Sequence, residues 1–402
     1  MADVVATNWA GNVSFRARTF AEPRSLSELR AIVAHADHVR ALGSGHSFSS
    51  IADTTGTQVS LAGLPPLMEI DSASRRVRVG GGVRYTELAP RLNTAGFALS
   101  NLASLPHISV AGACTTATHG SGDGNGNLAT AVAGLEMVTA TGDLIEMGRD
   151  HPDFCGAVVT LGRLGIVSAL TLDLVPSFEI SQYVYDDLPN ERLDADFDTI
   201  FASGYSVSVF TDLSRNTLWC KRLAADPPPP PEWFGAQAAD GPRNPVPGMP
   251  VQNATEQGGV PGPWHTRLPH FRAEFTPSAG NELQSEYLLP RAHGVAALRA
   301  MRELRDQITA VLQICEIRTV AADELWLSPS YRRPTVGVHF TWVDDAAGVA
   351  PVVATVEERL APFEARPHWG KVHAMSGRYE RLADFTRLAH ELDPDGKFGQ
   401  AS

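Results

Sequence analysis

Near the N-terminus, apolar residues recur at the spacing of a helix and share one of its faces: Leu26, Leu29, Ile32 and Val33. Ser25, followed three residues later by Glu28, has the form of a capping box and marks the start of this helix, which we expect to run to about Ala36. Residues 39–42 are then expected to form a short strand. The strand leads directly into a turn rich in glycine and serine.

The pattern predicts further elements up to Pro176: a strand at 76–79, a helix at 86–93 closed by Gly96, a hairpin over 135–147 that turns at 141–143, and a strand within 164–176. Pro90 is placed in the first turn of the second helix, where a proline costs little. Leu170, Leu172 and Leu174 alternate onto one face of the last strand. Pro176 marks a domain boundary.

After this boundary, strands and helices alternate in a way that predicts an antiparallel sheet covered by helices, and hence an α+β fold. We expect strands at 205–210, 218–222, 271–275 and 283–289, and helices at 293–313 and 351–360. Residues 227–231 are consecutive prolines and predict an extended polyproline segment, within a Pro/Gly-rich surface excursion or lid that continues to residue 263. A final helix at 381–391 is expected to return to the first domain.

The turn after the first strand has two interpretations that the turn alone leaves open. Gly43 and Gly45 allow successive backbone N–H groups to point into one concavity and bind a pyrophosphate, with hydroxyl donors from Ser44 and Ser47. An ordinary Gly/Ser turn has the same composition. The order of helix, strand and glycine turn differs from the strand, Gly-x-Gly-x-x-Gly and helix of a Rossmann unit, which disfavours a nicotinamide-binding domain.

A second stretch, residues 103–122, is unusually rich in small and hydroxylated residues. Such a composition allows the backbone to approach a flat ligand closely. A flexible loop would have similar residues, but Leu105, Ile108 and Val110 favour a packed segment.

Two expected strands of the second domain carry polar residues at a spacing of two. Glu316 and Arg318 project to one face, and so do His339 and Thr341. A sheet face exposed to water produces the same alternation. The mixture of acid, guanidinium, imidazole and hydroxyl instead resembles a set of groups that binds a polyol. Lys371, after Trp369 and Gly370, adds a cation, although a surface lysine on a loop has the same pattern.

The composition narrows the class of protein. The 402 residues are 43% hydrophobic and 19% charged, which is typical of a soluble globular protein with room for two domains. The formal charge of −12 disfavours nucleic acid and anionic lipid as partners. Four well-separated cysteines favour free thiols over a zinc site. The sequence shows no signal peptide and no spanning segment, so we expect a cytoplasmic protein without a bound metal or membrane.

Together these motifs resemble the vanillyl-alcohol-oxidase-type (PCMH-type) FAD flavoproteins and, among them, the bacterial alditol (xylitol or sorbitol) oxidases. The resemblance extends along most of the chain, through residues 42–48, 103–122, 161–176, 245–250, 255–278, 315–322 and 366–372. It implies an FAD-binding domain of residues 1–176, completed by 376–402, and a cap or substrate domain of residues 177–375.

The resemblance also assigns site residues. It implies a covalent bond from His46 to the 8-alpha carbon of the flavin, and FAD contacts from Ala41, Leu42, Gly43, Ser44, Gly45, His46, Ser47, Ser104, Ser109, Gly112, Ala113, Cys114, Thr115, His119, Ile166 and His368. It implies that the substrate is bound by Ser104, Glu316, Arg318, Thr341 and Lys371, and that His339, Lys371 and Arg318 are catalytic.

The implied reaction is oxidation of the terminal primary alcohol of an alditol to an aldose. Hydride passes to flavin N5, the hydroxyl proton passes to His339, and O2 is reduced to H2O2. The partners are therefore a small polyol and O2, and we expect a monomer. Two alternatives remain: an aldonolactone oxidase or dehydrogenase of the same family, and a flavin- or sugar-binding module without turnover.

Overall fold

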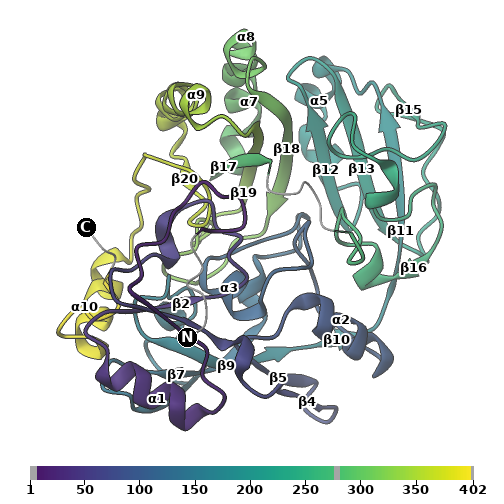
Figure 1. Ribbon diagram of the computed structural model, residues 1–402. Helices are drawn as coiled ribbons and strands as arrows, with labels where there is room; N and C mark the ends of the chain where they lie inside the picture. The colour runs from purple at the N-terminus through teal and green to yellow at the C-terminus, as the bar shows by residue number, and fades with distance from the viewer. Residues whose placement is uncertain (1–6, 276–280, 400–402) are drawn as a thin grey trace.

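A computed structural model describes residues 7–275 and 281–399 of the chain. The last residues of the 255–278 stretch lie outside this description. Two sheets dominate the molecule, one of five strands from the chain before residue 176 and one of ten strands from the chain after it. In Figure 1 the smaller sheet lies at the bottom and the larger one above it.

A three-stranded parallel sheet precedes the five-stranded one and positions the glycine turn. Its order is β1 (Thr19–Ala21), β3 (Thr57–Ser60) and β2 (Val39–Leu42). Helix α1 (Leu26–His35) buries Leu29 and Val33 and is capped by Ser25, whose Oγ accepts a hydrogen bond from the N–H of Glu28 at 3.1 Å. The second hydrogen bond of a capping box, from the N–H of Ser25 to the Glu28 carboxylate, is not formed. The Glu28 carboxylate accepts instead from the N–H of Arg24.

The five-stranded antiparallel sheet has the order β4 (Met68–Asp71), β5 (Arg76–Gly80), β9 (Ile166–Asp173), β7 (Val132–Val138) and β8 (Leu144–Gly148). Two helices pack against its core, α2 (Tyr85–Thr94) and α3 (Val110–Thr115). The predicted strands, the hairpin and α2 are confirmed. Pro90 lies in the second turn of α2 rather than the first, because the helix begins at Tyr85. A short pair, β6 (Phe97–Ala98) and β10 (Val175–Pro176), completes this part.

The large antiparallel sheet carries the far wall of the site. Its strands, in spatial order, are β14 (Glu232–Trp233), β15 (Ala236–Ala238), β11 (Glu179–Asp186), β13 (Asn216–Leu223), β12 (Ser206–Thr211), β18 (Leu312–Val320), β19 (Thr335–Val343), β17 (Glu282–Pro290) and β20 (Arg366–Pro367), with β16 (Gly262–Pro263) paired to β11. One face is covered by helices: α5 (Asn190–Ala195), α6 (Phe197–Phe201), α7 (Gly294–Glu303), α8 (Arg305–Ile308) and α9 (Ala346–Leu360).

Three predicted elements of this domain differ from the structure. Residues 271–275 form a turn with a single bridge at Phe271 and no strand. The expected single helix at 293–313 is instead two helices, α7 and α8, interrupted at Leu304, and residues from Leu312 onward belong to β18 because they pair with β19. Helix α9 begins five residues before the predicted start at residue 351, since the Asp345 side chain caps it by accepting from the N–H of Gly348.

The C-terminal segment packs against elements from the first half of the chain. Helix α10 (Leu382–Leu392) lies beside α4 (Phe154–Ala157), and Arg387 forms an ion pair with Asp153 at 2.6 Å. Figure 1 shows α10 in yellow next to the N-terminal elements. The guanidinium of buried Arg40 in β2 donates to the Phe398 carbonyl at 2.8 Å, which ties the end of the chain to the strand before the glycine turn.

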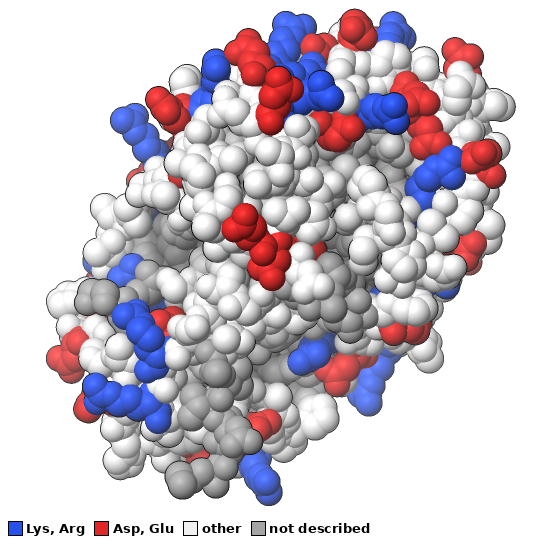
Figure 2. Space-filling model, turned by 45° about the horizontal axis from the view of Figure 1, so that its top comes forward, with Lys and Arg blue, Asp and Glu red and all other residues white. Residues whose placement is uncertain are grey.

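Several chain-wide expectations can also be compared with the structure. All four cysteines are free, three of them buried and Cys155 half-buried. Throughout the described ranges, every helix is too short or too polar to cross a bilayer. Figure 2 shows Lys and Arg side chains interspersed with Asp and Glu over one face of the molecule.

Candidate active site

A single cavity of about 310 Å³ separates the glycine turn from the large sheet. One end is lined by residues 41–49 after β2 and by residues around α3. The other end is lined by β17, β18 and β19 and by the segment after β20. Residues of the Pro/Gly-rich region also reach this cavity, among them Asn244, Val246 and Met249, so this region forms part of the wall in addition to its surface portions.

The glycine turn presents unused backbone donors to the cavity. Within the described chain, the N–H groups of residues 43–47 have no hydrogen-bond acceptor, although all five residues line the cavity. Gly45 has a φ of 71°, a conformation that favours glycine. A Cβ on Gly43 would lie 2.6 Å from the Oγ of Ser109, so this close approach also requires glycine. Adjacent free amides of this kind form an anion-binding nest.

His46 lies at the tip of this turn with an uncharged ring. Its imidazole stacks on Trp9 with a centroid separation of 4.9 Å, and Nδ1 lies 3.1 Å from the Ser44 carbonyl oxygen. Burial lowers the pKa of His46 to about 4, despite the opposing effect of that carbonyl. The ring is therefore neutral, and nucleophilic, at neutral pH.

Most of the predicted cofactor residues line the cavity: Ala41, Leu42, Gly43, Ser44, Gly45, His46, Ser47, Ser104, Ser109, Gly112, Ala113, Thr115, His119 and His368. Two do not. The thiol of Cys114 is buried against the Tyr85 hydroxyl and the Leu128 carbonyl, on the opposite side of α3. Ile166 packs into the core beneath α1. Neither side chain is placed to touch a ligand in this cavity.

The two polar pairs predicted from the sequence lie side by side on the far wall. In the antiparallel register of β18 and β19, Glu316 lies opposite His339, and Ile314 lies opposite Thr341. Glu316, Arg318, His339 and Thr341 are each between 4% and 7% exposed and all line the cavity. The alternative of a face exposed to bulk water is therefore wrong.

Arg318 lies at the centre of the ionic contacts on this wall. Its Nη2 donates to Oε1 of Glu286 at 2.5 Å, and its Nε lies 3.6 Å from Oε2 of Glu316. Its Nη1 donates, at 3.4 Å each, to the Ser104 hydroxyl and the His119 carbonyl. The two carboxylates raise the pKa of Arg318 against the effect of burial, so the guanidinium stays charged.

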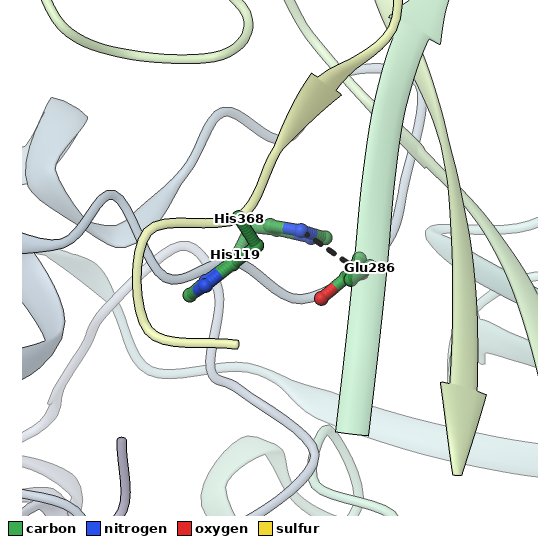
Figure 3. A group of neighbouring side chains, drawn as sticks. All are labelled: His119, Glu286 and His368. Carbon is green, nitrogen blue, oxygen red and sulfur yellow. Dashed lines mark ion pairs between the residues drawn. The ribbon is translucent and has the colours of Figure 1, made fainter. Parts of the chain in front are cut away.

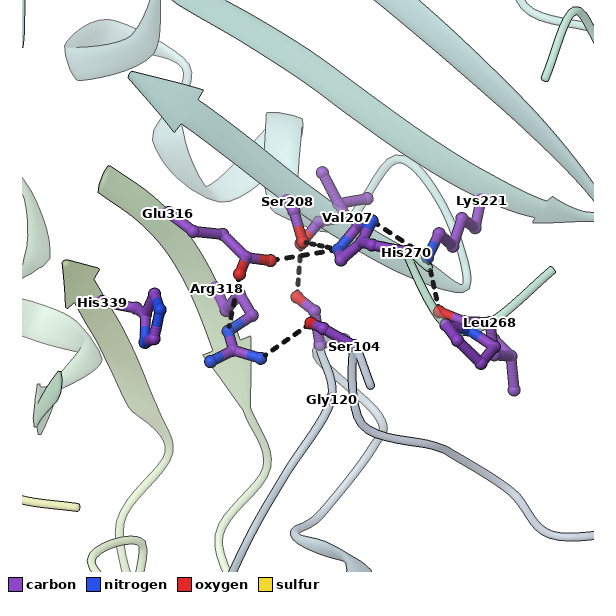
Figure 4. Close-up of polar contacts among 12 residues, drawn as sticks. Ser104, Gly120, Val207, Ser208, Lys221, Leu268, His270, Glu316, Arg318 and His339 are labelled. Carbon is purple, nitrogen blue, oxygen red and sulfur yellow. Dashed lines mark hydrogen bonds and ion pairs between the residues drawn. The ribbon is translucent and has the colours of Figure 1, made fainter. Parts of the chain in front are cut away.

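A buried chain of polar groups continues behind Glu316 and was not predicted (Figure 4). Oε1 of Glu316 accepts from Nε2 of His270 at 3.1 Å, and Nδ1 of His270 lies 3.3 Å from Nζ of Lys221. Lys221 also donates to the Leu268 carbonyl at 2.5 Å. Burial lowers the pKa of Lys221 to about 7, whereas Arg318 and His270 hold the pKa of Glu316 well below its usual range in spite of burial.

Lys371 completes the wall on the side nearest the glycine turn. Its ammonium donates to Oε1 of Gln284 and lies 5.5 Å above the ring of Phe48. Burial lowers the pKa of Lys371 to about 8, with Glu286 acting in the opposite direction. The Gly370 carbonyl accepts from the N–H of Phe48 at 2.7 Å, so the lysine segment is joined directly to the turn that carries His46.

Several residues of the cavity wall were not predicted from the sequence. Glu282, Gln284 and Glu286 of β17 alternate onto the cavity face, a spacing of two that was visible in the expected strand at 283–289. His270 and Lys221 gave no such signal. His270 reaches Glu316 from a loop, and Lys221 of β13 is joined to Glu316 through His270, because β12 lies between β13 and β18.

Comparison with known proteins agrees with this architecture. Residues 17–148 match the family described as FAD binding domain, and residues 280–401 match the family described as D-arabinono-1,4-lactone oxidase. The alditol oxidase of a Streptomyces species is 52% identical, covering 98% of this chain and 96% of its own length. An L-gulono-1,4-lactone dehydrogenase of Mycobacterium tuberculosis is 29% identical, covering 98% and 96%.

Among solved structures, a cholesterol oxidase from B. sterolicum has the same fold. It superposes with a TM-score of 0.77 at 14% sequence identity, covering 98% of this chain and 94% of its own. The predicted α+β class with two domains is thus confirmed. The fold, the FAD-binding family match and the relative at 52% identity place the chain in the vanillyl-alcohol-oxidase-type family of FAD flavoproteins, among the alditol oxidases.

Proposed function

We propose that this protein is an oxidase that uses FAD to convert the terminal primary alcohol of an alditol, such as xylitol or sorbitol, to the aldose, with O2 reduced to H2O2. One observation carries the proposal: a single cavity joins the free amides of the glycine turn to a wall of carboxylate, guanidinium, imidazole, hydroxyl and ammonium groups. The 52% identity to an alditol oxidase over nearly the whole chain supports the same substrate class.

The glycine turn fits the cofactor. Five adjacent amides without acceptors among the described residues suit a pyrophosphate, and the missing Cβ of Gly43 allows this turn to lie against Ser109 at the start of α3. We assign the flavin attachment to His46, whose ring is neutral and held by Trp9. Acid precipitation tests the attachment: flavin colour that leaves with the supernatant would show that the bond does not exist.

Residues of the far wall accept the substrate proton, stabilise the alkoxide and bind the other hydroxyls. Bound FAD provides the hydride acceptor and returns the electrons to O2. His339, whose pKa is lowered to about 4 by burial and by Lys371, is neutral at pH 7 and takes the hydroxyl proton. Lys371 and Arg318 stabilise the developing alkoxide. Glu316, Thr341 and the half-buried Ser104 hold the other hydroxyls of the polyol.

A panel of alditols with peroxide detection tests this function. We expect H2O2 in a 1:1 ratio with aldose from xylitol or sorbitol under air. Absence of peroxide with every alditol, in a preparation that contains stoichiometric FAD, would refute it.

A second candidate is oxidation of an aldonolactone, favoured by the match of residues 280–401 to the D-arabinono-1,4-lactone oxidase family and by the M. tuberculosis relative. The same panel separates the two, because this candidate predicts turnover of L-gulono-1,4-lactone and none of xylitol. An artificial electron acceptor replaces O2 in the assay if the enzyme is a dehydrogenase.

We further propose that residues 1–176 with 376–402 form the FAD-binding domain and residues 177–375 the substrate domain. The boundary at 176 falls between β9 of the small sheet and β11 of the large one, and α10 packs against α4, which supports this division. A monomer in the cytoplasm is our expectation. Free thiols at all four cysteines support a reducing compartment, and gel filtration tests the monomer.

A further inference from the structure

Glu286 of β17 is a buried carboxylate for which the proposed function has no role. Its side chain is 1% exposed and faces the cavity wall, directly opposite His339 in the register of β17 and β19. A Cβ on the neighbouring Gly337 would lie 3.3 Å from Oε1 of Glu286, so the glycine leaves the space that the carboxylate fills. An ionised group in this position requires specific partners.

The two carboxylate oxygens are divided among three side chains. Oε1 accepts from Nη2 of Arg318 at 2.5 Å and lies 3.2 Å from Nε2 of His119. Oε2 lies 3.4 Å from Nδ1 of His339. Burial raises the pKa of Glu286, but Arg318 and His119 outweigh it and hold this pKa well below its usual range, so the group is an anion.

These contacts determine which nitrogen of His339 carries the proton. Among the described residues Nδ1 makes no hydrogen bond, and the oxygen paired with it is the anionic Oε2 of Glu286 at 3.4 Å. A carboxylate beside one ring nitrogen places the proton there and leaves the other nitrogen with a free lone pair. In His339 that nitrogen is Nε2, which in this tautomer accepts a hydrogen bond from the Thr341 hydroxyl at 3.2 Å, the direction in which a substrate hydroxyl would also donate.

A metal site is the competing interpretation of this carboxylate. His119, Glu286 and His368 offer ligand atoms within 4.8 Å of one another (Figure 3). However, the Arg318 guanidinium already donates to Oε1, the oxygen nearest to His119. A cation at that oxygen would face a fixed positive charge, and the carboxylate charge is already compensated.

We propose that Glu286 is a positioning residue, which keeps the proton of His339 on Nδ1 and turns Nε2 toward the substrate. This inference rests on the proposed function. The O–H bond of the alcohol breaks as an N–H bond forms at Nε2. The carbon loses a hydride to FAD, and the alcohol becomes an aldehyde. The proton on Nε2 then leaves with the reduction of O2 to H2O2.

The variant Glu286→Gln keeps the shape of the side chain and removes its charge. The amide can donate to Nδ1, which would move the proton of His339 to Nε2 and block proton acceptance. We expect the rate of anaerobic flavin reduction by xylitol to fall about 100-fold at saturating substrate. The KM should change far less than the rate. Glu286→Asp retains the charge with a shorter reach and should lose about 10-fold.

A double-mutant cycle separates this role from a general structural one. If Glu286 acts through His339, then Glu286→Gln added to His339→Gln should reduce the rate by less than about threefold further. Additive losses would overturn the proposal, and so would a wild-type rate in Glu286→Gln. If Glu286→Gln does not retain FAD, Glu286→Asp is carried through the same cycle with the same criterion.

The acid side of the pH profile is a further readout. The charged groups facing His339 are Glu286 from β17, Arg318 and Glu316 from β18, and Lys371 from the segment after β20. Loss of the Glu286 charge should move the acid limb of kcat/KM to lower pH, because a cationic imidazole is less favoured without it. A purely structural role would leave the limb in place.

Glu357 provides the matched control. It is also a buried carboxylate, 6% exposed, and accepts from the Tyr287 hydroxyl at 3.0 Å and from the N–H groups of Ala374 and Met375. Glu357→Gln should lower stability while flavin reduction keeps its wild-type rate. An inactive wild-type protein would refute the proposed function, whereas an active wild type with unaffected Glu286 variants would refute this inference alone.

Discussion

Replacing Lys371 by Met removes a charge and leaves a side chain of similar length. The ammonium donates to Gln284 and lies over Phe48 at the edge of the cavity wall, where the proposed alkoxide develops. Removing one donor that stabilises a developing oxyanion typically lowers kcat by about 10²- to 10³-fold. We expect a loss of this size with xylitol as substrate.

The free energy of unfolding of Lys371→Met should not fall together with its activity. The pKa of Lys371 is lowered from 10.5 to about 8, so the folded state disfavours the ammonium by about 3 kcal/mol at pH below 8. Because the side chain is half-buried, we reduce this to about 1–2 kcal/mol. The lost hydrogen bond to Gln284 offsets about 1 kcal/mol. Lys371→Met should therefore unfold at the same urea concentration as the wild type at pH 7, or at a slightly higher one.

The pH profile provides the third measurement. Lys371 acts as a cation, so kcat/KM of the wild type should fall as pH rises through about 8, and this alkaline limb should be missing in Lys371→Met. Steady-state peroxide formation from pH 5 to 10 gives kcat and kcat/KM, and urea unfolding at pH 7 gives the stability. A variant with wild-type kcat, or one destabilised by more than about 2 kcal/mol with its alkaline limb intact, would show that the Lys371 ammonium does not stabilise the alkoxide.

Three further predictions concern neighbouring groups. The pKa of buried Lys221 is lowered to about 7, so between pH 7 and pH 9 the unfolded chain binds this proton more tightly than the folded one. The free energy of unfolding of the wild type should therefore rise by about 2–3 kcal/mol over this range relative to that of Lys221→Met. A constant difference between the two proteins in urea unfolding would contradict this. Glu316→Gln should raise the KM for xylitol about 10- to 100-fold with a smaller change in kcat, and an unchanged KM would remove this residue from the substrate site. Gly43→Ala should lower the ratio of flavin to protein, because its Cβ would meet the Ser109 Oγ at 2.6 Å. Adding Ser109→Ala should restore the ratio, since the remaining Ser109 Cβ lies 3.8 Å away, and a failure to restore it would argue against this clash.

Local patterns predicted much of the fold. The apolar face of α1 and the alternation in β18 and β19 are patterns among residues close together in the sequence, and these elements are confirmed. The end of the helix expected at 293–313 was wrong, because the residues after Ile308 suit a helix as well as a strand and only pairing with β19 decides between them. Tertiary contacts therefore set that boundary.

In the candidate site, too, residues within a local pattern could be predicted, and residues that meet only in the folded chain could not. Glu316 and His339 could be found because each lies in a strand with polar residues at a spacing of two, and strand pairing brings them together. Glu286 had the same signal within β17, where Glu282 and Gln284 precede it. His270 had none, since it reaches Glu316 from a loop through a contact between residues 46 positions apart.

Anaerobic addition of xylitol to the FAD-loaded enzyme isolates the first half of the reaction, because no O2 is present to reoxidise the flavin. We expect that the flavin absorbance near 450 nm bleaches fully with one equivalent of xylitol, that aldose forms in the same amount, and that air restores the colour with release of H2O2. An oxidised flavin spectrum that persists with xylitol and sorbitol, in a protein that carries one FAD per chain, would contradict the proposed function.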